Sequence, residues 1–297
     1  MAMFEGFTKT RIEVSSIAVN LVQGGDGPPL LLLHGYPQTH AMWHKVAPQF
    51  AGHYTVVAPD LRGYGDSGKP ASDDLNDFCK RTSAQDQVEV MAALGFERFH
   101  VVGHDRGARV GHRMALDHPA RVRSFTSLDV VASQAAFDNM NRDLAYSWFH
   151  WHLMRQPSPF PETLIGNSAK FYLDFLLGQW TAVDGAITDE AYAEYLRCFS
   201  NPETIRTTCM DYRAIAVDLV HDEADRGRKI ACPMLVLWAG NMARRPGWQT
   251  GGTLNMIGSW QERAGDVRGR ALDCGHFLAE EAPDETAREI LAFLAGC

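Results

Sequence analysis

The stretch Val101-Val102-Gly103-His104-Asp105-Arg106-Gly107-Ala108-Arg109 decides the fold of this 297-residue chain. An apolar run that starts at Phe99 ends in glycine, one acidic residue follows, and a segment compatible with a helix continues to about residue 118. The pattern predicts a strand, a tight turn and a helix, with Asp105 at the corner. Gly103 and Gly107 would let the strand and the helix pack closely, and the helix N-terminus favours negative charge at the corner.

This corner has the form of a nucleophile elbow, small-x-nucleophile-x-small, as in α/β-hydrolases, with Asp105 where esterases carry serine. Serine suits acyl transfer, but its attack on a saturated carbon would give an ether that water does not release. A carboxylate that attacks the same carbon gives an alkyl ester, and water can then attack the ester carbonyl. The aspartate therefore predicts displacement at an sp3 carbon, either dehalogenation or epoxide opening, provided that a base and an orienting acid follow.

The composition favours a globular enzyme and excludes several other classes. The chain is 45% hydrophobic with a net charge of −8, which suits one large α/β domain or a core with an inserted subdomain. The negative charge and the lack of a Lys/Arg-rich block argue against nucleic acid, and no apolar run approaches transmembrane length. Six scattered cysteines without CxxC spacing, and an N-terminus without a signal-peptide pattern, lead us to expect a cytoplasmic protein.

Alternating strands and helices predict an α/β-hydrolase fold, a mostly parallel sheet flanked by helices. Strands are expected within residues 11–22 as an opening antiparallel pair, and then at 30–33, 54–58, 99–102, 125–128, 233–238 and 267–272, with helices at 83–94 and 284–294. From 132 to 222 helical and aromatic stretches dominate and no convincing strand is found. We therefore expect a core of residues 1–131 and 223–297, with a helical cap, 132–222, inserted into it.

A catalytic triad can be assigned from chain order, because α/β-hydrolases place nucleophile, acid and histidine in that sequence. His276 follows the last expected strand, where the base belongs. The loop after the strand at 233–238 carries no carboxylate at its turn, whereas Asp129 directly follows the strand at 125–128. Asp129 is therefore predicted to fix the tautomer of His276 and to steady the imidazolium. Asp273 is the rival, and we expect it to pack locally.

Two arginines beside the nucleophile predict an anionic substrate. Arg106 directly follows Asp105, and Arg109 lies one helical turn along the same face. Guanidinium groups bind a planar carboxylate through forked hydrogen bonds, and for Arg106, at the corner itself, this interpretation outweighs a solvated surface charge. Tyr36 lies in the turn after the strand at 30–33. The backbone amides of Tyr36 and Arg106 would receive the oxyanion that forms when water attacks the ester.

Three motifs together resemble the fluoroacetate dehalogenases: the elbow from Gly103 to Arg109, the run Asp211-Tyr212-Arg213-Ala214, and the His150-Trp151 pair ahead of Gln156-Pro157. The resemblance extends over nearly the whole chain. It implies that Asp105 is the nucleophile, His276 the base and Asp129 its acid partner. It further implies that Arg106 and Arg109 bind the substrate carboxylate, while His150, Trp151 and Tyr212 hold the leaving fluoride.

The activity implied by this resemblance is hydrolysis of short 2-haloacids, chiefly fluoroacetate, to glycolate and fluoride, by a protein that is commonly a homodimer. Three converging donors, an imidazole N–H, an indole N–H and a phenol O–H, would stabilise fluoride as its charge develops. Without the resemblance, Trp151 and Tyr212 would be interpreted as cap packing. The chain departs from the family at Ala108, where glycine is usual, at His152 and Arg155, and over 241–248, which bears on substrate range more than on reaction type.

Two other functions stay open. An epoxide hydrolase would use the same Asp105 with Tyr212 as the acid, although Arg106 argues against it because that group typically has an aromatic residue after the nucleophile. A non-catalytic ligand receptor on the same fold is disfavoured by the complete triad. No metal and no organic cofactor are expected, because the pairs His150/His152 and His100/His104 have no companion ligands at metal-binding spacing.

Overall fold

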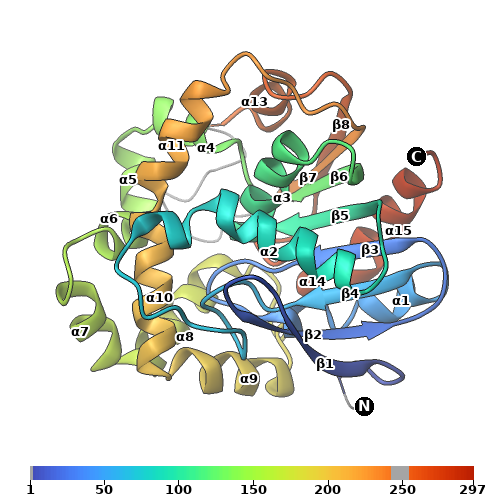
Figure 1. Ribbon diagram of the computed structural model, residues 1–297. Helices are drawn as coiled ribbons and strands as arrows, with labels where there is room; N and C mark the ends of the chain where they lie inside the picture. Colours follow the sequence, from blue (N-terminus) through green and yellow to red (C-terminus); the bar gives the residue numbers. More distant parts are fainter. Residues whose placement is uncertain (1–2, 242–253) are drawn as a thin grey trace.

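The computed structural model describes residues 3–241 and 254–297, so residues 242–248 of the segment that departs from the family lie outside it (Figure 1). Within these ranges the strands form one eight-stranded sheet in the order β1-β2-β4-β3-β5-β6-β7-β8. The strands are β1 (Thr8–Glu13), β2 (Ala18–Gly24), β3 (Pro29–Leu33), β4 (Thr55–Pro59), β5 (Phe99–His104), β6 (Val122–Leu128), β7 (Met234–Ala239) and β8 (Val267–Leu272).

The sheet is mostly parallel, as predicted. The strands from β4 through β3, β5, β6 and β7 to β8 pair in parallel, whereas β1 and β2 form an antiparallel pair that joins the sheet against β4. The leucines of β3 are fully buried because helices cover both faces of the sheet, which explains the continuous apolar run in this strand. The α/β-hydrolase architecture is therefore confirmed.

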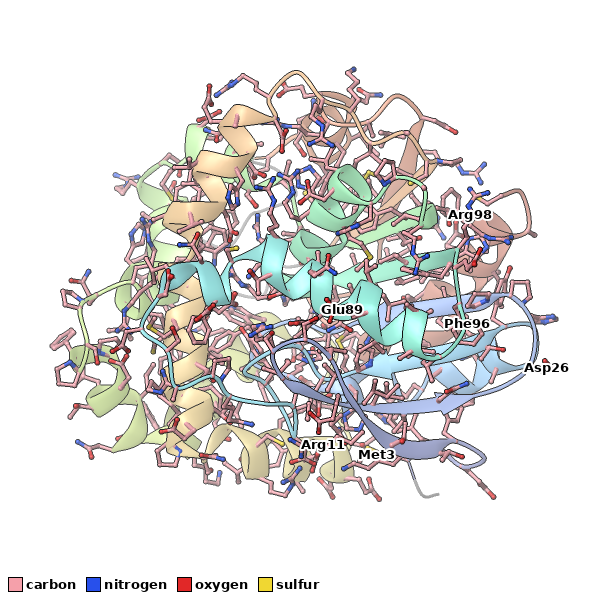
Figure 2. All side chains as sticks on the ribbon, viewed as in Figure 1. Met3, Arg11, Asp26, Glu89, Phe96 and Arg98 are labelled. Atoms are coloured by element: carbon pink, nitrogen blue, oxygen red, sulfur yellow. The ribbon has the colours of Figure 1, made fainter. Side chains whose placement is uncertain are left out.

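Helices pack on both faces of the sheet. Helices α2 and α3 lie together on one face, and α1 and α15 contact each other on the opposite face (Figure 1). Glu89 of α2, which is labelled in Figure 2, accepts a hydrogen bond from the amide of Ser15 at 2.7 Å and so ties this helix to the β1–β2 turn. Among the described residues, the helices outside 133–224 are η1 (His40–Trp43), α1 (Ala47–Ala51), η2 (Leu75–Phe78), α2 (Lys80–Ala93), α3 (Arg106–Asp117), α13 (Met256–Gln261), α14 (Leu278–Glu281) and α15 (Pro283–Leu294).

Between β6 and β7 the chain forms helices only, and no strand occurs between residues 132 and 222, all of which are described. These helices form a separate layer at the left of Figure 1, where α10 packs against α6 and α7. They are α4 (Ser133–Asp138), α5 (Arg142–Ser147), α6 (Phe149–Met154), α7 (Phe160–Gly166), α8 (Ala169–Trp180), α9 (Asp189–Phe199), α10 (Pro202–Arg213) and α11 (Ile215–Ala224).

Within the described residues, no helix is both long and apolar enough to span a membrane. The six cysteines are all free.

Candidate active site

Asp105 stands at a strained corner between β5 and α3. It is the residue before the first turn of α3, and its backbone has φ 45° and ψ −113°, a conformation that non-glycine residues rarely adopt. The two glycines of the motif make the corner possible. A Cβ on Gly103 would lie 2.6 Å from the Cα of Ala108, and one on Gly107 would lie 2.3 Å from the carbonyl oxygen of Leu33. Strand and helix can approach this closely only without side chains at these positions.

The carboxylate of Asp105 is partly buried and is held in its charged form. Its Oδ1 accepts a hydrogen bond of 3.0 Å from the backbone amide of Tyr36. Burial alone would raise the pKa of Asp105, but the positive charges of His276 and Arg106 outweigh burial and lower that pKa below its ordinary value. The side chain therefore carries a negative charge at neutral pH, as a nucleophile requires.

Asp129 and His276 are hydrogen-bonded, as the chain order suggested. The Nδ1 of His276 lies 2.6 Å from Oδ2 of Asp129, and the other carboxylate oxygen accepts from the amide of Ala239 at 2.9 Å. Asp129 also has a positive φ, 51°, directly after β6, so its side chain turns back toward the histidine. The rival carboxylate, Asp273, is exposed to solvent.

Two opposing effects set the pKa of His276. Burial lowers it, but the hydrogen bond and charge of Asp129, together with the charge of Asp105, outweigh burial and raise the pKa of His276 above its ordinary value of 6.5. The neighbouring His104 behaves differently. Its pKa falls to about 3 because it is buried and lies beside His276, and its Nε2 lies 2.8 Å from the backbone oxygen of His276. His104 is therefore a neutral donor that supports the loop of His276.

Glu281 of α14 fixes the loop that carries His276. Its two carboxylate oxygens accept four backbone N–H groups at 2.7 to 3.0 Å, and these belong to Gly275, Phe277, Ala182 and Val183. The first two flank His276, and the other two follow α8. One buried carboxylate thus joins the base loop to the helical layer between β6 and β7.

The two predicted arginines have different surroundings. Arg109 lines the cavity above Asp105, donates from Nη1 to Ser133 at 2.8 Å and has its guanidinium 4.9 Å from the centre of the Trp151 ring. Burial and the nearby charge of Arg106 lower the pKa of Arg109 to about 10, so it remains cationic at neutral pH. An anion in the cavity would relieve the mutual repulsion of these two cations.

Arg106 is fully buried behind the cavity rather than among its lining residues. The Nε of Arg106 donates a hydrogen bond of 2.7 Å to a carboxylate oxygen of Asp211. The Nη2 of Arg106 donates one of 2.9 Å to the backbone carbonyl of the same residue. Lys80 donates to the other carboxylate oxygen, and Tyr64 donates to the first at 2.8 Å. Only Nη1 of Arg106 has no partner among the described residues. Asp211 therefore fixes the guanidinium and leaves one nitrogen available for a ligand.

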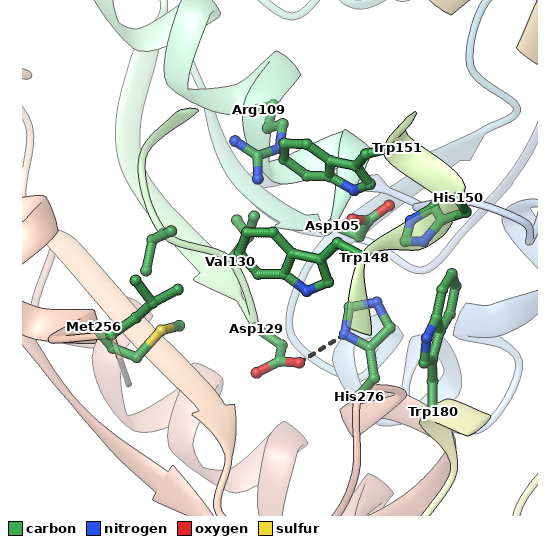
Figure 3. Close-up of a pocket in the computed structure, with 12 residues that line it drawn as sticks. Asp105, Arg109, Asp129, Val130, Trp148, His150, Trp151, Trp180, Met256 and His276 are labelled. Atoms are coloured by element: carbon green, nitrogen blue, oxygen red, sulfur yellow. Dashed lines mark hydrogen bonds and ion pairs between the residues drawn. The ribbon is translucent and has the colours of Figure 1, made fainter. Parts of the chain in front are cut away.

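The cavity at the elbow is small and is lined in large part by aromatic side chains (Figure 3). It leaves about 50 Å³ for the centres of water-sized molecules, which suits a ligand of a few heavy atoms. Asp105, Arg109 and His150 face it from one side, and the Asp129–His276 pair faces it from another (Figure 3). The lining residues are Asp105, Arg109, Asp129, Val130, Val131, Trp148, His150, Trp151, Trp180, Leu254, Met256 and His276.

The three residues expected to hold the halide lie together. The ring of Tyr212 is 5.6 Å from that of His150 and 6.3 Å from that of Trp151. The Nδ1 of His150 and the hydroxyl of Tyr212 are buried without a hydrogen-bond partner in the described part of the chain. Burial lowers the pKa of His150 to about 3, so its imidazole is neutral. Unpartnered buried polar groups are uncommon in proteins. His150 and Trp151 line the cavity, whereas Tyr212 is fully buried and is not among the lining residues.

The residues that depart from the family lie around this site. Ala108 is fully buried at the start of α3, His152 is exposed, and the guanidinium of Arg155 lies 5.5 Å from the ring centre of Phe137. His152 cannot join His150 as a metal ligand here, because one side chain points to solvent and the other is buried.

Sequence reasoning missed several residues of the site. Trp148 stacks on Trp151 with ring centres 5.1 Å apart. The backbone carbonyl of Trp180 accepts a hydrogen bond of 2.9 Å from the backbone amide of His276. Trp148 stands close to the singled-out His150-Trp151 pair, so aromatic spacing could have suggested it. Lys80 lies 131 positions from Asp211, and nothing in the sequence indicates that these two residues pair.

The comparisons with known proteins agree with this geometry. A family model for the alpha/beta hydrolase fold matches residues 28–241. A fluoroacetate dehalogenase of Burkholderia sp is 42% identical over 99% of this chain and 95% of its own length. A soluble epoxide hydrolase of Corynebacterium sp. is 32% identical over 95% of each chain. The crystal structure of ALR0039 from Nostoc sp PCC 7120, described as an alpha/beta hydrolase, superposes with a TM-score of 0.94 at 50% identity over 98% of this chain and 99% of that one.

The two relatives and the solved structure match over 95% or more of this chain. The predicted resemblance to the fluoroacetate dehalogenases is confirmed. The chain is a hydrolase that belongs to the α/β-hydrolase family and is related to the fluoroacetate dehalogenases.

Proposed function

We propose that this enzyme hydrolyses short 2-haloacids, and chiefly converts fluoroacetate and water to glycolate and fluoride without a metal or cofactor. The observation that carries the proposal is the pairing, in one small cavity, of a charged Asp105 at the elbow with the cationic side chain of Arg109. A neutral substrate would not need the arginine, and an acyl substrate would not need an aspartate nucleophile.

The substrate carboxylate would bind to the two arginines. Arg109 faces the cavity, and the free Nη1 of Arg106 would supply a second donor. The Nε and Nη2 of Arg106 already donate to Asp211, so the guanidinium has little freedom to turn. Arg106 therefore binds the carboxylate in a fixed direction and leaves C2 of the substrate close to Asp105.

In the first step, Oδ2 of Asp105 attacks C2, the O–C bond forms, and the C–F bond breaks with its electron pair leaving on fluoride. We assign the attack to Oδ2 because Oδ1 is held by the amide of Tyr36. His150, Trp151 and Tyr212 would donate hydrogen bonds to the departing fluoride, which is small and strongly hydrated in water. The free hydroxyl of Tyr212 and the free Nδ1 of His150 support this role.

In the second step, His276 takes a proton from a water molecule, and the hydroxide attacks Cγ of the Asp105 ester. The ester carbonyl oxygen is then Oδ1, so the developing oxyanion forms where the amide of Tyr36 already donates. Asp129 steadies the imidazolium through the 2.6 Å contact with Nδ1. Collapse of the intermediate breaks the bond between Cγ and the ester oxygen, which leaves with glycolate and takes the proton from His276. The oxygen from water stays on Asp105, and the acid so formed loses its proton to solvent, which restores the carboxylate.

Replacement of His276 by asparagine tests this mechanism. Without the base, the first step should proceed and the second should stop, so the ester accumulates. After incubation with fluoroacetate, the intact His276→Asn protein should gain the mass of one carboxymethyl group, located on the peptide that contains Asp105. A variant that gains no mass but has lost its turnover would contradict the covalent mechanism.

Epoxide hydrolysis is the second candidate, because a soluble epoxide hydrolase is 32% identical over 95% of each chain. Asp105 would open the ring, and the unpartnered hydroxyl of Tyr212 would protonate the epoxide oxygen. The cationic Arg109 in the cavity favours an anionic substrate instead. Diol formation from small neutral epoxides, measured beside fluoride release, separates the two activities.

We further propose that residues 132–222 act as a cap over a core of 1–131 and 223–297, that the enzyme is cytoplasmic and that it forms a homodimer. The support for the cap is that Trp148, Trp151 and Trp180, all within this segment, line the cavity. The support for the dimer is the exposed aromatic face of α8, where Phe171 is 73% exposed.

A further inference from the structure

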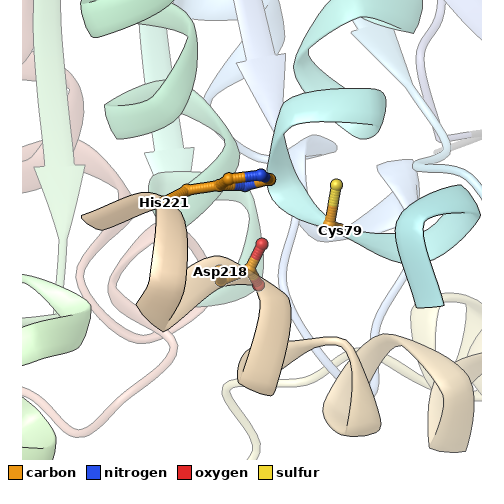
Figure 4. Close-up of side chains that lie close together, drawn as sticks. All are labelled: Cys79, Asp218 and His221. Atoms are coloured by element: carbon orange, nitrogen blue, oxygen red, sulfur yellow. The ribbon is translucent and has the colours of Figure 1, made fainter. Parts of the chain in front are cut away.

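A cluster of three side chains that could bind a metal lies outside the active site, where the N-terminus of α2 meets α11 (Figure 4). Cys79 immediately precedes α2, and Asp218 and His221 lie one turn apart on α11. One sulfur, carboxylate oxygen or imidazole nitrogen from each residue lies within 4.8 Å of the other two. Cys79 and Asp218 are buried, and His221 is partly exposed. In the described part of the chain, no other group of three such residues has this geometry.

Two of the three side chains each carry a possible metal-binding atom that has no protein partner among the described residues. Oδ1 of Asp218 accepts the backbone amide of Lys80 at 2.7 Å, but its Oδ2 is buried without a hydrogen-bond partner among the described residues. The Nδ1 of His221 is buried and unpartnered in the same way. A buried carboxylate oxygen that no donor satisfies is rare and commonly indicates a missing water or ion.

The protonation states suit a metal of the zinc class. Burial, and then the charge of Arg81, lower the pKa of His221, so its imidazole is neutral and offers a lone pair. Burial raises the pKa of Asp218, against the opposing charge of Lys80, and a bound cation would lower that pKa by its charge. The Sγ of Cys79 donates to the carbonyl of Asn76 at 3.3 Å, and that proton would leave on binding.

The nearby cations are directed elsewhere. Lys80 extends its ammonium group to Asp211, and Arg81 pairs with Asp117 at 2.8 Å. Arg113 pairs with Asp117 and Asp225 at 2.6 Å each. None of these three groups is directed at the cluster, and each has a carboxylate partner of its own.

We propose that Cys79, Asp218 and His221 bind one divalent cation of the zinc class, with water from the exposed side of His221 as the fourth ligand. The thiolate Sγ, the free Oδ2 and the free Nδ1 are a borderline-soft donor set that zinc prefers over magnesium or calcium. Tetrahedral zinc holds its ligands at about 2.0–2.3 Å, so the three atoms would draw together by small side-chain rotations. Binding releases the thiol proton and any proton on Asp218.

The site would join two parts of the molecule. Cys79 belongs to the segment that opens α2 against the sheet, whereas Asp218 and His221 belong to the last helix before β7. The metal would therefore stabilise the contact of α11 with the core. It is a structural site, distinct from the reaction at Asp105, and it needs no catalytic role.

The test uses the full-length protein after dialysis against a chelator. Zinc bound after equilibrium dialysis should reach one equivalent per chain, and the melting temperature should rise with zinc concentration, because the folded state binds the ion. Cobalt in place of zinc should give a thiolate-to-metal charge-transfer band in the near ultraviolet. Cys79→Ser should abolish that band, and both Cys79→Ser and His221→Gln should abolish the zinc-dependent rise in melting temperature. Cys232→Ser, which removes a free thiol that is not part of the cluster, should behave as the parent protein.

Three results would overturn the proposal. The first is no zinc retained by the parent protein above the level of Cys79→Ser. The second is a cobalt spectrum without a thiolate band. The third is binding that survives in Cys79→Ser and in His221→Gln alike, which would assign the ion to other residues. Because His221 is partly exposed, His221→Gln keeps the test decisive even if Cys79→Ser unfolds.

Discussion

At the scale of single residues, the chemistry depends on how Asp105 and His276 influence each other. In the proposed mechanism, His276 must be neutral to activate water. Burial lowers the pKa of His276, but Asp129 and Asp105 outweigh burial. The pKa of His276 is therefore raised, which favours the protonated form. Esterification of Asp105 removes one of those two negative charges. The pKa of His276 should therefore fall once the intermediate forms, at the step where the histidine acts as base.

The pH profile reports this effect. The rate of ester hydrolysis rises with pH as His276 loses its proton. The acid side of the curve of kcat against pH therefore reports the pKa of His276 in the ester intermediate. In Asp129→Asn, the main group that raises this pKa is gone, and the acid limb should shift to lower pH while kcat falls, because the tautomer is no longer fixed. Measurement of kcat against pH for both proteins checks this, and an unmoved limb would remove Asp129 from its proposed role.

The fluoride site is also tested at single residues. Tyr212→Phe removes one donor from the proposed halide site and should reduce fluoride release from fluoroacetate about 100-fold. Chloride release from chloroacetate should fall less, because chloride needs less stabilisation as it leaves. Tyr192→Phe is the matched control, since Tyr192 bonds to Asp174 near the surface, away from the cavity. Equal losses on the two substrates would mean that Tyr212 does not bind the halide.

At the scale of elements, the elbow constrains the sequence most strongly. A Cβ on Gly107 would lie 2.3 Å from the carbonyl oxygen of Leu33, so Gly107→Ala should force α3 away from β3 and destabilise the protein by about 1–3 kcal/mol. Gly178, inside α8, has open space around it, and Gly178→Ala should stabilise by about 0.5–1 kcal/mol. Urea unfolding of the two variants should give opposite signs. Loss of stability in both would indicate that packing at the elbow is not the cause.

Glu281 should matter through the loop that it holds. Glu281→Gln keeps the shape of the side chain but replaces one acceptor oxygen with an NH2 group that faces backbone N–H donors. The loss of these hydrogen bonds should lower the free energy of unfolding by about 1–3 kcal/mol. Because the amides flank His276, kcat should fall as well, with little change in KM. Glu289→Gln, which weakens surface ion pairs with Arg270 and Arg288, should cost about 0–1 kcal/mol and leave kcat unchanged. Melting curves and initial rates of both variants check this.

Most of the elements could be predicted from the sequence because their patterns are local. The leucines of β3 and the turn at Asp105 are read from a few neighbouring residues, and their predicted bounds agree with the structure. The four amides bound by Glu281 could not be found in this way. Two of them lie about 100 positions away, and a buried glutamate has the same sequence signature as an exposed one.

At the scale of the whole molecule, the candidate site joins segments that are distant in the sequence. The chain order suggested that Asp129 and His276 lie together, and they are hydrogen-bonded at 2.6 Å, whereas their catalytic roles stay a proposal. The position of Arg106 behind the cavity depends on Lys80 and Asp211, which meet only when α10 packs near α2. Such pairings follow from tertiary packing and leave no periodic signal in the chain.

The proposed homodimer is a prediction at this scale. The exposed side chains of Phe160 and Leu164 on α7, and of Phe171 and Phe175 on α8, lie on two helices that pack against each other. Light scattering coupled to gel filtration should give twice the chain mass of 33.0 kDa, and Phe171→Asp should give a single chain mass. A Phe171→Asp protein that stays dimeric would place the interface elsewhere.

The central claim is that a charged aspartate at the elbow displaces halide from an acid held by arginine. Fluoride release from fluoroacetate, followed with an ion-selective electrode on purified protein without added metal, tests it most directly. We predict steady release by the parent protein, and none by Asp105→Asn. Fluoride release that persists in Asp105→Asn, or a parent protein that releases no halide from fluoroacetate or chloroacetate, would contradict the claim.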